Sequence, residues 1–247
     1  MTHEPDPADP AHPADPADPT SKGGAVLFDV DGTLVDTNYL HVVAWMAAFQ
    51  SVGQPVDSVA VHHAIGMGAG QLMERLVGPD AARRVGETAH DEHRRRYRET
   101  FERMRRFDGA AELLRAVARR ATVVLATSAN AEEVSALRRA LDADDAITAV
   151  TGGDDVKAAK PDPDVVAVAL EKAAVPPDRA VFVGDTVWDV EAAGKADLPC
   201  VAVLTGGICR EALEHAGAVA VYADVAELLA AIDDSPLAQV FTRRETR

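Results

Sequence analysis

The chain has 247 residues, of which 47% are hydrophobic, and its formal net charge is −15 at pH 7. This is enough for one large or two modest domains with a real core, and no apolar run approaches the roughly 20 residues of a membrane span. The negative charge argues against nucleic acid as a partner, because nucleic-acid binding calls for a basic stripe on the protein.

The N-terminal segment, residues 1–22, repeats Ala, Asp and Pro and has almost no large apolar side chains. Such a composition cannot bury a core, so we expect a disordered extension with no part in the chemistry. The segment also lacks the apolar stretch of a signal peptide. Cys200 and Cys209 do not form a metal-binding pair and are expected to be reduced. The missing signal-peptide stretch and the reduced cysteines together predict a cytoplasmic protein.

The first predicted strand is the apolar run 25–28, which is bounded by glycines and is typical of a buried parallel strand. Asp29 and Asp31 follow it, at the end of the strand where open α/β sheets bind ligands. Two carboxylates held there repel each other and need a cation or a shared proton. Mg²⁺ suits oxygen ligands and accepts substrate phosphate as a further ligand. A carboxylate can also attack phosphorus and form an aspartyl-phosphate.

The next stretch has a helical pattern and no strand signal, so we expect a separate helical unit there. Ile65-Gly66-Met67-Gly68-Ala69-Gly70 is a glycine-rich turn, which either approaches a substrate with its backbone or is a plain linker. The arginines within 94–106 are interpreted as a solvated helix face paired with glutamates, with steering of an anionic substrate as the alternative. His41 is the best histidine for a polar contact at the mouth of a site, although packing is favoured. The expected helices are 39–52, 56–65, 71–77 and 79–106.

Strands and helices then alternate to the end of the chain, which predicts a parallel sheet with crossover helices, a Rossmann-like α/β core. The expected strands are 122–126, 146–150, 179–183, 200–204 and 218–222. The expected helices are 110–120, 131–141, 163–174, 188–196, 209–216 and 224–232. We therefore predict a core domain over 23–37 and 108–234, a helical domain over 38–107 and a loose tail over 235–247.

Four segments in chain order resemble the motifs of the haloacid dehalogenase (HAD) superfamily. They are Asp29-Val30-Asp31-Gly32-Thr33-Leu34-Val35-Asp36, Thr127-Ser128, Lys160-Pro161-Asp162-Pro163-Asp164 and Gly184-Asp185-Thr186-Val187-Trp188-Asp189. The resemblance is to the phosphoglycolate phosphatase-like and β-phosphoglucomutase-like members. It implies a Rossmann-like HAD core with a parallel sheet and a small helical cap, inserted after the first motif, that closes over the site.

The resemblance also implies roles for single residues. Asp29 would be the nucleophile, and Asp31 the general acid to the leaving alcohol and then the base for water. Lys160 would hold Asp29 and offset phosphoryl charge. The substrate phosphate would be bound by Thr127, Ser128, Gly32 and Lys160. The cofactor Mg²⁺ would be held by Asp29, Asp31 (through its backbone), Asp185 and Asp189, the last directly or through water.

Each residue also has a purely structural interpretation. Thr127 could cap the following helix, as could Ser128 or Asn130. Lys160 could be a solvated lysine before a proline-rich turn. Asp185 and Asp189 could be exposed acids in the first turn of a helix, where the helix dipole favours them. Their joint placement at strand ends favours the catalytic interpretation.

We predict a Mg²⁺-dependent phosphatase that hydrolyses a small phosphate monoester, phosphoglycolate-like or a sugar phosphate, through an aspartyl-phosphate. One alternative is a phosphohexomutase-like phosphotransferase, which is disfavoured because the turn at Gly68-Ala69-Gly70 lacks an arginine. A non-catalytic regulatory protein is disfavoured by the intact set of acids and Lys160, and dehalogenation is disfavoured by Asp31. The partner would be a small-molecule phosphate ester, and both a monomer and a homodimer remain open.

Overall fold

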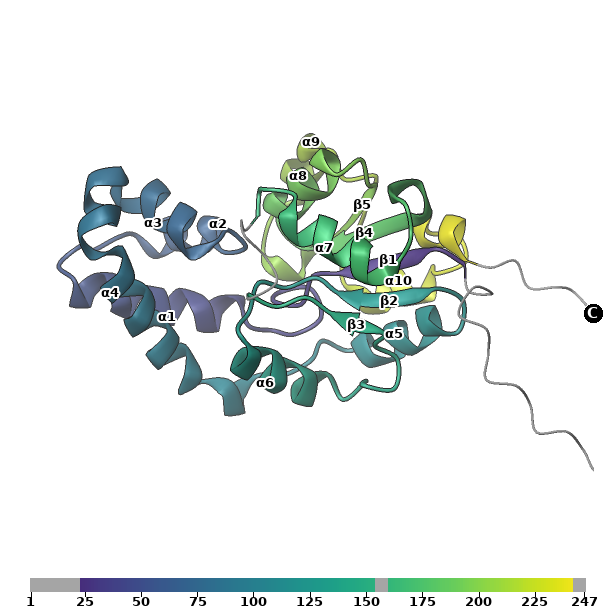
Figure 1. Cartoon of the computed structure of the whole chain (residues 1–247), viewed down its shortest axis with the longest axis horizontal. Helices are drawn as coiled ribbons and strands as arrows, with labels where there is room; N and C mark the ends of the chain where they lie inside the picture. Colours follow the sequence, from purple (N-terminus) through teal and green to yellow (C-terminus); the bar gives the residue numbers. More distant parts are fainter. Residues whose placement is uncertain (1–22, 154–159, 242–247) are drawn as a thin grey trace, which may run out of the picture.

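The computed structural model describes residues 23–153 and 160–241. The predicted disordered extension at 1–22 lies outside the described residues, as do residues 242–247 of the predicted loose tail. The described chain forms an α/β core with a group of helices extending from one end of it (Figure 1). No helix within these ranges combines the length and apolar character that a membrane span requires.

The core is built on a six-stranded sheet with the order β3-β2-β1-β4-β5-β6. Every pair of neighbouring strands is parallel, and β1 lies between β2 and β4. The carboxyl ends of these three strands therefore meet at one edge of the sheet. The strands are β1 (Ala25–Phe28), β2 (Thr122–Leu125), β3 (Ala149–Val150), β4 (Ala180–Gly184), β5 (Cys200–Val203) and β6 (Ala220–Tyr222). The predicted Rossmann-like α/β fold is confirmed.

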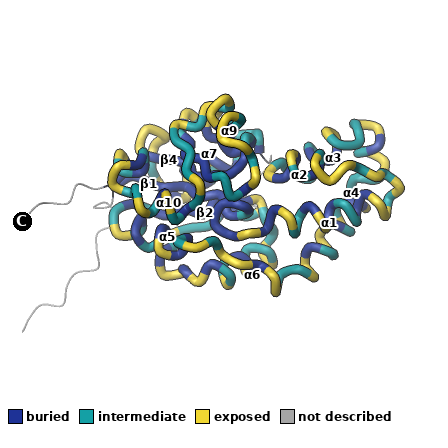
Figure 2. Tube along the Cα trace, turned by 180° about the vertical axis from the view of Figure 1, so that it is seen from behind, coloured by how far each residue is buried: buried dark blue, intermediate teal, exposed yellow. Residues whose placement is uncertain are grey.

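Alternate residues of the central strand supply two separate cores, one on each face of the sheet. Val26 and Phe28 belong to one cluster, and Ala25 and Leu27 belong to the other. All four residues are fully buried, and the tube in Figure 2 is dark along β1 and β2 for this reason. The helices α5 (Ala110–Ala118), α6 (Ala131–Leu141) and α10 (Val225–Ala230) cover the first face. The helices α7 (Asp164–Ala173), α8 (Val187–Lys195) and α9 (Arg210–Ala216) cover the second.

The remaining helices form a unit with its own apolar core, which we call the cap. Trp45, Phe49, Leu72 and Met73 are buried in that core. We propose that this unit is the domain predicted over 38–107. Its helices are α1 (Asn38–Ser51), α2 (Ser58–Ala64), α3 (Ala69–Val77) and α4 (Pro79–Arg98).

The helix predicted over 79–106 ends earlier than expected, at Arg98. A 3-10 helix, η2 (Phe101–Arg103), follows it, and Met104 is then 3% exposed in the core. Arg106 forms an isolated bridge with Val35. The chain must leave the helix at this point because these contacts carry it back from the cap to the core.

The prediction of a loose tail from Ser235 is wrong for residues 235–241. Ser235 caps the 3-10 helix η5 (Pro236–Val240), and Val240 accepts a backbone hydrogen bond of 2.6 Å from Gly24. Leu237 and Phe241 are buried against the core. Three apolar side chains on one face of a short helix suffice to hold this segment on the sheet. The other 3-10 helices are η3 (Pro177–Arg179) and η4 (Leu204–Gly206).

Candidate active site

The loop after β1 brings Asp29 and Asp31 to the carboxyl edge of the sheet. The backbone N–H of Asp29 still donates to Val183 of β4, at 2.8 Å, so Asp29 continues the sheet. The chain then turns sharply at Gly32, whose φ is +80°. A Cβ on Gly32 would lie 2.2 Å from Asn38 Nδ2 and 2.4 Å from Asp185 Oδ2. Glycine is therefore required here both by backbone conformation and by space.

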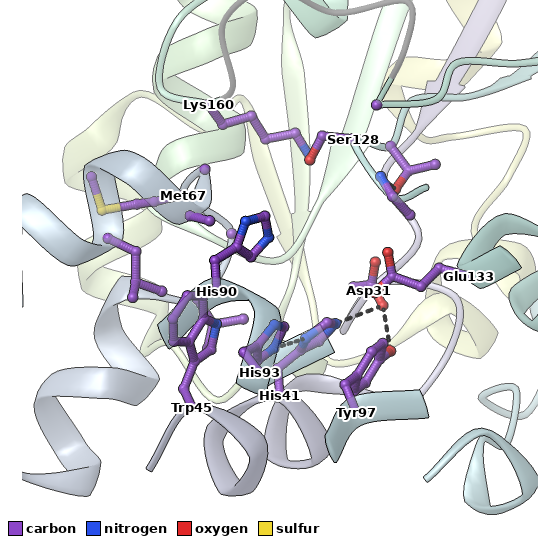
Figure 3. Close-up of a pocket in the computed structure, with 18 of the residues that line it drawn as sticks. Asp31, His41, Trp45, Met67, His90, His93, Tyr97, Ser128, Glu133 and Lys160 are labelled. Atoms are coloured by element: carbon purple, nitrogen blue, oxygen red, sulfur yellow. Dashed lines mark hydrogen bonds and ion pairs between the residues drawn. The ribbon is translucent and has the colours of Figure 1, made fainter. Parts of the chain in front are cut away.

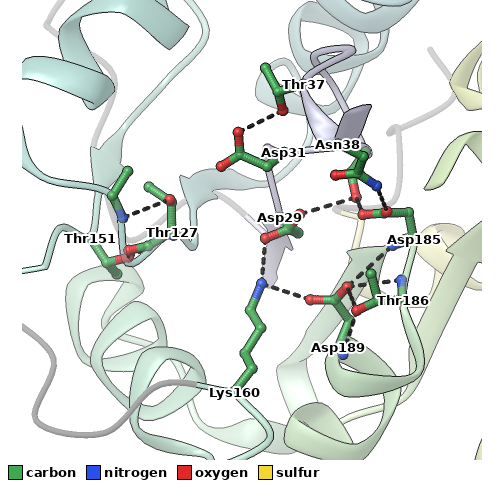
Figure 4. A network of polar contacts seen from close by, with 12 residues as sticks. Asp29, Asp31, Thr37, Asn38, Thr127, Thr151, Lys160, Asp185, Thr186 and Asp189 are labelled. Atoms are coloured by element: carbon green, nitrogen blue, oxygen red, sulfur yellow. Dashed lines mark hydrogen bonds and ion pairs between the residues drawn. The ribbon is translucent and has the colours of Figure 1, made fainter. Parts of the chain in front are cut away.

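Lys160 lies among the carboxylates and bridges two of them (Figure 4). Its ammonium group donates to Asp29 and lies 2.7 Å from Asp189 Oδ1. All three side chains are buried. Burial alone would lower the pKa of Lys160, but the carboxylates of Asp189 and Asp29 outweigh this and raise it above the usual range. Lys160 is therefore a charged part of the site, and the interpretation as a solvated lysine is wrong.

Asp185 lies at the end of β4, where it is fully buried. Thr33 Oγ1 donates to its Oδ1 at 2.7 Å, and Asn38 Nδ2 donates to its Oδ2 at 2.9 Å. A Cβ on Gly206 would lie 1.9 Å from Asp185 Oδ2, so the loop after β5 also packs directly on this carboxylate. Asp185 is fixed by neighbours from three segments and is not an exposed acid of a helix.

Asp189 has a structural role as well as a place in the cluster. Thr186 is the N-cap of α8, and Asp189 completes a capping box with it. Asp189 Oδ2 accepts from the Thr186 hydroxyl at 2.6 Å and from the Thr186 backbone N–H at 3.0 Å. Its other oxygen faces Lys160. The side chain is 1% exposed, so the alternative interpretation as an exposed first-turn acid is wrong for Asp189 too.

Asp29, Asp185 and Asp189 form a group whose carboxylate oxygens lie within 4.8 Å of one another. Burial, and then the neighbouring carboxylates, raise the pKa of Asp185 well above its ordinary value. Burial likewise raises the pKa of Asp29 to about 7, although Lys160 acts in the opposite direction. One ammonium group does not balance three buried carboxylates. A hard divalent cation with oxygen ligands would correct the balance, so the donor set fits Mg²⁺.

The carboxylate of Asp31 is directed away from this group, toward the cap. It accepts from Thr37 Oγ1 at 2.6 Å and from the Tyr97 hydroxyl at 3.4 Å, and it lies 3.4 Å from His41 Nε2. Burial acts to raise the pKa of Asp31, but the bonds from His41 and Thr37 outweigh it and the pKa is lowered. Asp29 therefore faces Lys160 and the other buried carboxylates, whereas Asp31 faces the cap.

His41 continues from Asp31 into the cap. Its Nδ1 lies 3.1 Å from His93 Nε2, and its ring stacks on Tyr97 with centroids 3.7 Å apart. His93 is buried and in turn stacks on Trp45, with centroids 4.2 Å apart (Figure 3). Sequence reasoning favoured packing for His41 and gave His93 no role. The spacing of His93 and Tyr97, four residues apart on one helix, was the available signal for a shared face.

Thr127 lies at the end of β2 and is 5% exposed. Its hydroxyl oxygen accepts from the backbone N–H of Ala129 at 3.0 Å, which leaves the hydroxyl hydrogen free to donate to a ligand. The following helix, α6, is capped by Asn130 through a capping box with Glu133. Thr127 is therefore not the cap of α6. Thr151 braces its backbone through two hydrogen bonds of 2.9 and 2.6 Å.

A cavity of about 330 Å³ lies between the core and the cap, which is the size of a small-ligand site. Asp29, Asp31, Thr127, Ser128 and Lys160 line it, whereas Gly32, Asp185 and Asp189 lie behind this lining. The cap contributes the other wall with His41, Trp45, Ile65, Gly66, Met67, Gly68, Ala69, Leu72, His90, His93 and Tyr97.

The glycine-rich turn of the cap lines this cavity and also touches the core. The N–H of Gly68 donates to the Lys160 carbonyl at 3.3 Å. Gly66 has a φ of +93°, and a Cβ there would lie 3.0 Å from Thr186 Oγ1. The turn is therefore more than a linker between two helices.

The arginines of α4 lie on a solvated helix face and pair with glutamates, as the first of the two interpretations predicted. Arg95 and Arg96 pair with Glu92, and Arg95 also pairs with Glu99, all at helical spacing. These groups are largely exposed, and the arginines within 94–106 do not line the cavity. The solvated face is what the sequence predicted.

Comparisons with known proteins identify a family that this chain matches. Residues 26–203 match the family model described as haloacid dehalogenase-like hydrolase. The chain is 32% identical over 202 residues to a phosphorylated carbohydrates phosphatase of Thermotoga maritima, which covers 79% of this chain and 92% of the relative. It is 33% identical over 216 residues to a phosphoglycolate phosphatase of Rhodospirillum rubrum, with coverages of 83% and 88%. The crystal structure of a hydrolase from Pseudomonas syringae has a TM-score of 0.78 and 31% identity, and covers 85% of this chain and 98% of that one.

Proposed function

The chain belongs to the haloacid dehalogenase-like hydrolase family, and within that family we propose that it is a Mg²⁺-dependent phosphatase of small phosphate monoesters. The proposed substrates are phosphoglycolate-like compounds or sugar phosphates, the classes in the names of its relatives. The observation that carries the proposal is the position of Asp29. It lies at the edge of the cavity beside Lys160, with Asp31 on the other side of the same loop.

In the first step, a carboxylate oxygen of Asp29 attacks the phosphorus of the ester. The new O–P bond forms an aspartyl-phosphate, and the bond from phosphorus to the alcohol oxygen breaks. Lys160 orients Asp29 and offsets negative charge on the phosphoryl group. The Thr127 hydroxyl donates to a phosphoryl oxygen. Gly32 was also expected to bind the phosphate, but it lies behind the cavity lining and its N–H donates to the Val35 carbonyl at 2.8 Å.

Asp31 moves the protons of both steps. The arriving phosphate adds negative charge beside Asp31 and so favours its protonated form, which can then protonate the leaving alcohol. The resulting carboxylate takes a proton from water. That water attacks phosphorus, releases phosphate and restores Asp29. His41 and Thr37 hold Asp31 in place through both steps.

Mg²⁺ would be held by Asp29, Asp185 and the backbone of Asp31, with support from Asp189. When bound, it neutralises charge on the transferring phosphoryl group. Thr33 and Asn38 fix the Asp185 oxygens, so this part of the site is formed before any ligand arrives.

The test is phosphate release from a panel of phosphate esters that includes phosphoglycolate, sugar monophosphates and p-nitrophenyl phosphate. We expect Asp29→Asn and EDTA each to abolish release. Asp36→Asn is the matched control, because Asp36 lies in the same motif but is exposed. Release that persists in Asp29→Asn would contradict the proposed nucleophile. No release from any ester by folded wild-type protein would favour a phosphotransferase or a non-catalytic protein.

A further inference from the structure

The cavity wall opposite the reacting groups is the place where a leaving group must lie. Asp29, Thr127 and Lys160 stand on the core side, and the cap side faces them. Apolar side chains on the cap side are those of Trp45, Ile65, Met67 and Leu72. Leu72 and Trp45 are almost completely buried, so they are fixed parts of this wall.

The wall offers little to an anion. Among the described residues that line the cavity, Lys160 is the only lysine or arginine, and its ammonium group is already shared by Asp29 and Asp189. The remaining charged groups of the lining are carboxyls, Asp31 and Glu133. A negatively charged leaving group would therefore enter beside carboxyl groups and find no free positive charge.

His90 and His93 of the cap do not supply that charge either, and His41 is already paired with Asp31. Burial lowers the pKa of His90, and it lowers the pKa of His93 well below the ordinary value. Both rings are therefore neutral at pH 7 and can offer a hydrogen bond to a hydroxyl group. Trp45 stacks on both rings, so these three side chains form an aromatic part of the cap wall.

The cap also contacts the core beside the cavity, so a leaving group there would be partly surrounded by protein. Gln71 donates to Asp162 at 2.8 Å, and Trp188 of the core donates to the carbonyl of His63 at 3.2 Å. A carboxylate against this wall would lose more hydration free energy than a hydroxyl group, which the neutral histidine rings can hydrogen-bond, or than a hydrocarbon.

We propose that this cavity selects phosphate esters of uncharged alcohols, whose carbon skeleton packs on the wall formed by Trp45, Ile65, Met67 and Leu72. Esters that carry a carboxylate or a second phosphate are disfavoured. The inference rests on the proposed phosphatase function and narrows it toward neutral polyol or sugar-type esters and away from phosphoglycolate itself.

The test compares esters of the same carbon skeleton that carry either a neutral hydroxymethyl group or a carboxylate. The pairs are 2-hydroxyethyl phosphate with phosphoglycolate, and 4-(hydroxymethyl)phenyl phosphate with 4-carboxyphenyl phosphate. We expect kcat/KM to favour the neutral member of each pair by at least about tenfold, the size of effect that pocket contacts commonly give. Turnover of p-nitrophenyl phosphate shows separately whether the phosphatase function holds.

Equal or better turnover of the anionic members would overturn the proposal.

A gain-of-charge variant tests the cause of the selectivity. Ala69→Arg places a cation at the cavity, and Ala69→Gln is the neutral control of similar length. We expect Ala69→Arg to move the ratio of kcat/KM toward the anionic member of each pair, and Ala69→Gln to leave the ratio unchanged. If both folded variants keep the wild-type ratio, the absence of a cation is not the cause and the proposal is wrong.

Discussion

Asp29 and Asp31 are two residues apart, yet the fold gives them opposite environments. Asp29 faces the buried carboxylates and Lys160, and its pKa is raised to about 7, first by burial. Asp31 faces the cap, and bonds from His41 and Thr37 hold its pKa below the ordinary value against the effect of burial. Two carboxylates held in different surroundings can take different roles in one reaction.

Replacing His41 is expected to change the pH dependence of catalysis. His41→Asn removes the imidazole beside Asp31, so the pKa of Asp31 should rise. The acidic limb of the kcat profile for p-nitrophenyl phosphate reports Asp31 as the base of the second step, so it should then move to higher pH, by on the order of one unit. His90→Asn is the control, because His90 lines the same cavity without contacting Asp31. An unmoved limb in folded His41→Asn would separate His41 from the proton chemistry.

The residues that sequence analysis found are those that follow strands within short motifs. Asp29, Thr127 and Asp185 could be predicted because each follows a strand in a known pattern, and Lys160 could be predicted because it precedes a proline in such a pattern. Asn38, His93 and Gly206 could not, because nothing in their local sequence says that they meet Asp185 or His41. Such contacts depend on how distant segments pack.

At the level of elements, the alternation of apolar runs and helical patterns predicted every strand of the sheet. The same reasoning failed at two ends. The helix α4 was expected to continue beyond Arg98, and the segment after Ser235 was expected to be loose. The burial of Met104 in the core determines where the chain leaves α4, and the burial of Leu237 holds the C-terminal segment. Neither contact can be predicted from a local sequence pattern.

The glycine-rich turn of the cap offers a matched pair of substitutions. Gly66→Ala should raise KM and lower kcat, because it strains a left-handed backbone and pushes the turn off Thr186. The backbone strain alone should cost about 1–2 kcal/mol of folding free energy. Gly70 is a residue of α3 with open space around it, so Gly70→Ala should raise the free energy of unfolding by roughly 0.5–1 kcal/mol.

Steady-state kinetics and urea unfolding of both glycine variants check this prediction. Wild-type kinetics in Gly66→Ala would show that the contact between the turn and Thr186 does not matter for catalysis.

For the whole molecule, the cap is expected to make the free energy of unfolding decrease as the pH falls. The pKa of His93 is lower in the folded state than in the unfolded chain, mainly because the ring is buried. Below the ordinary value of about 6.5, the unfolded chain binds a proton that the folded chain excludes. The free energy of unfolding should therefore decrease by up to about 1.4 kcal/mol per pH unit for this group as pH falls from that value.

His93→Phe keeps an aromatic ring in the stack and removes the titration. Urea unfolding between pH 8 and about pH 5 should show a shallower decrease in the variant than in the wild type. His215→Phe, at an exposed position of α9, is the control for losing one imidazole. Parallel curves for wild type and His93→Phe would mean that His93 does not contribute to acid sensitivity.

The central claim is that the cap and core enclose a phosphatase site in which Asp29 becomes phosphorylated. The most direct measurement is rapid-quench mass spectrometry of Asp31→Asn after mixing with p-nitrophenyl phosphate and Mg²⁺. The leaving group needs no acid, but the second step lacks its base, so one phosphoryl group should accumulate on the peptide that contains Asp29. A phosphoryl group on any other residue, or none at all despite release of nitrophenolate, would contradict the account.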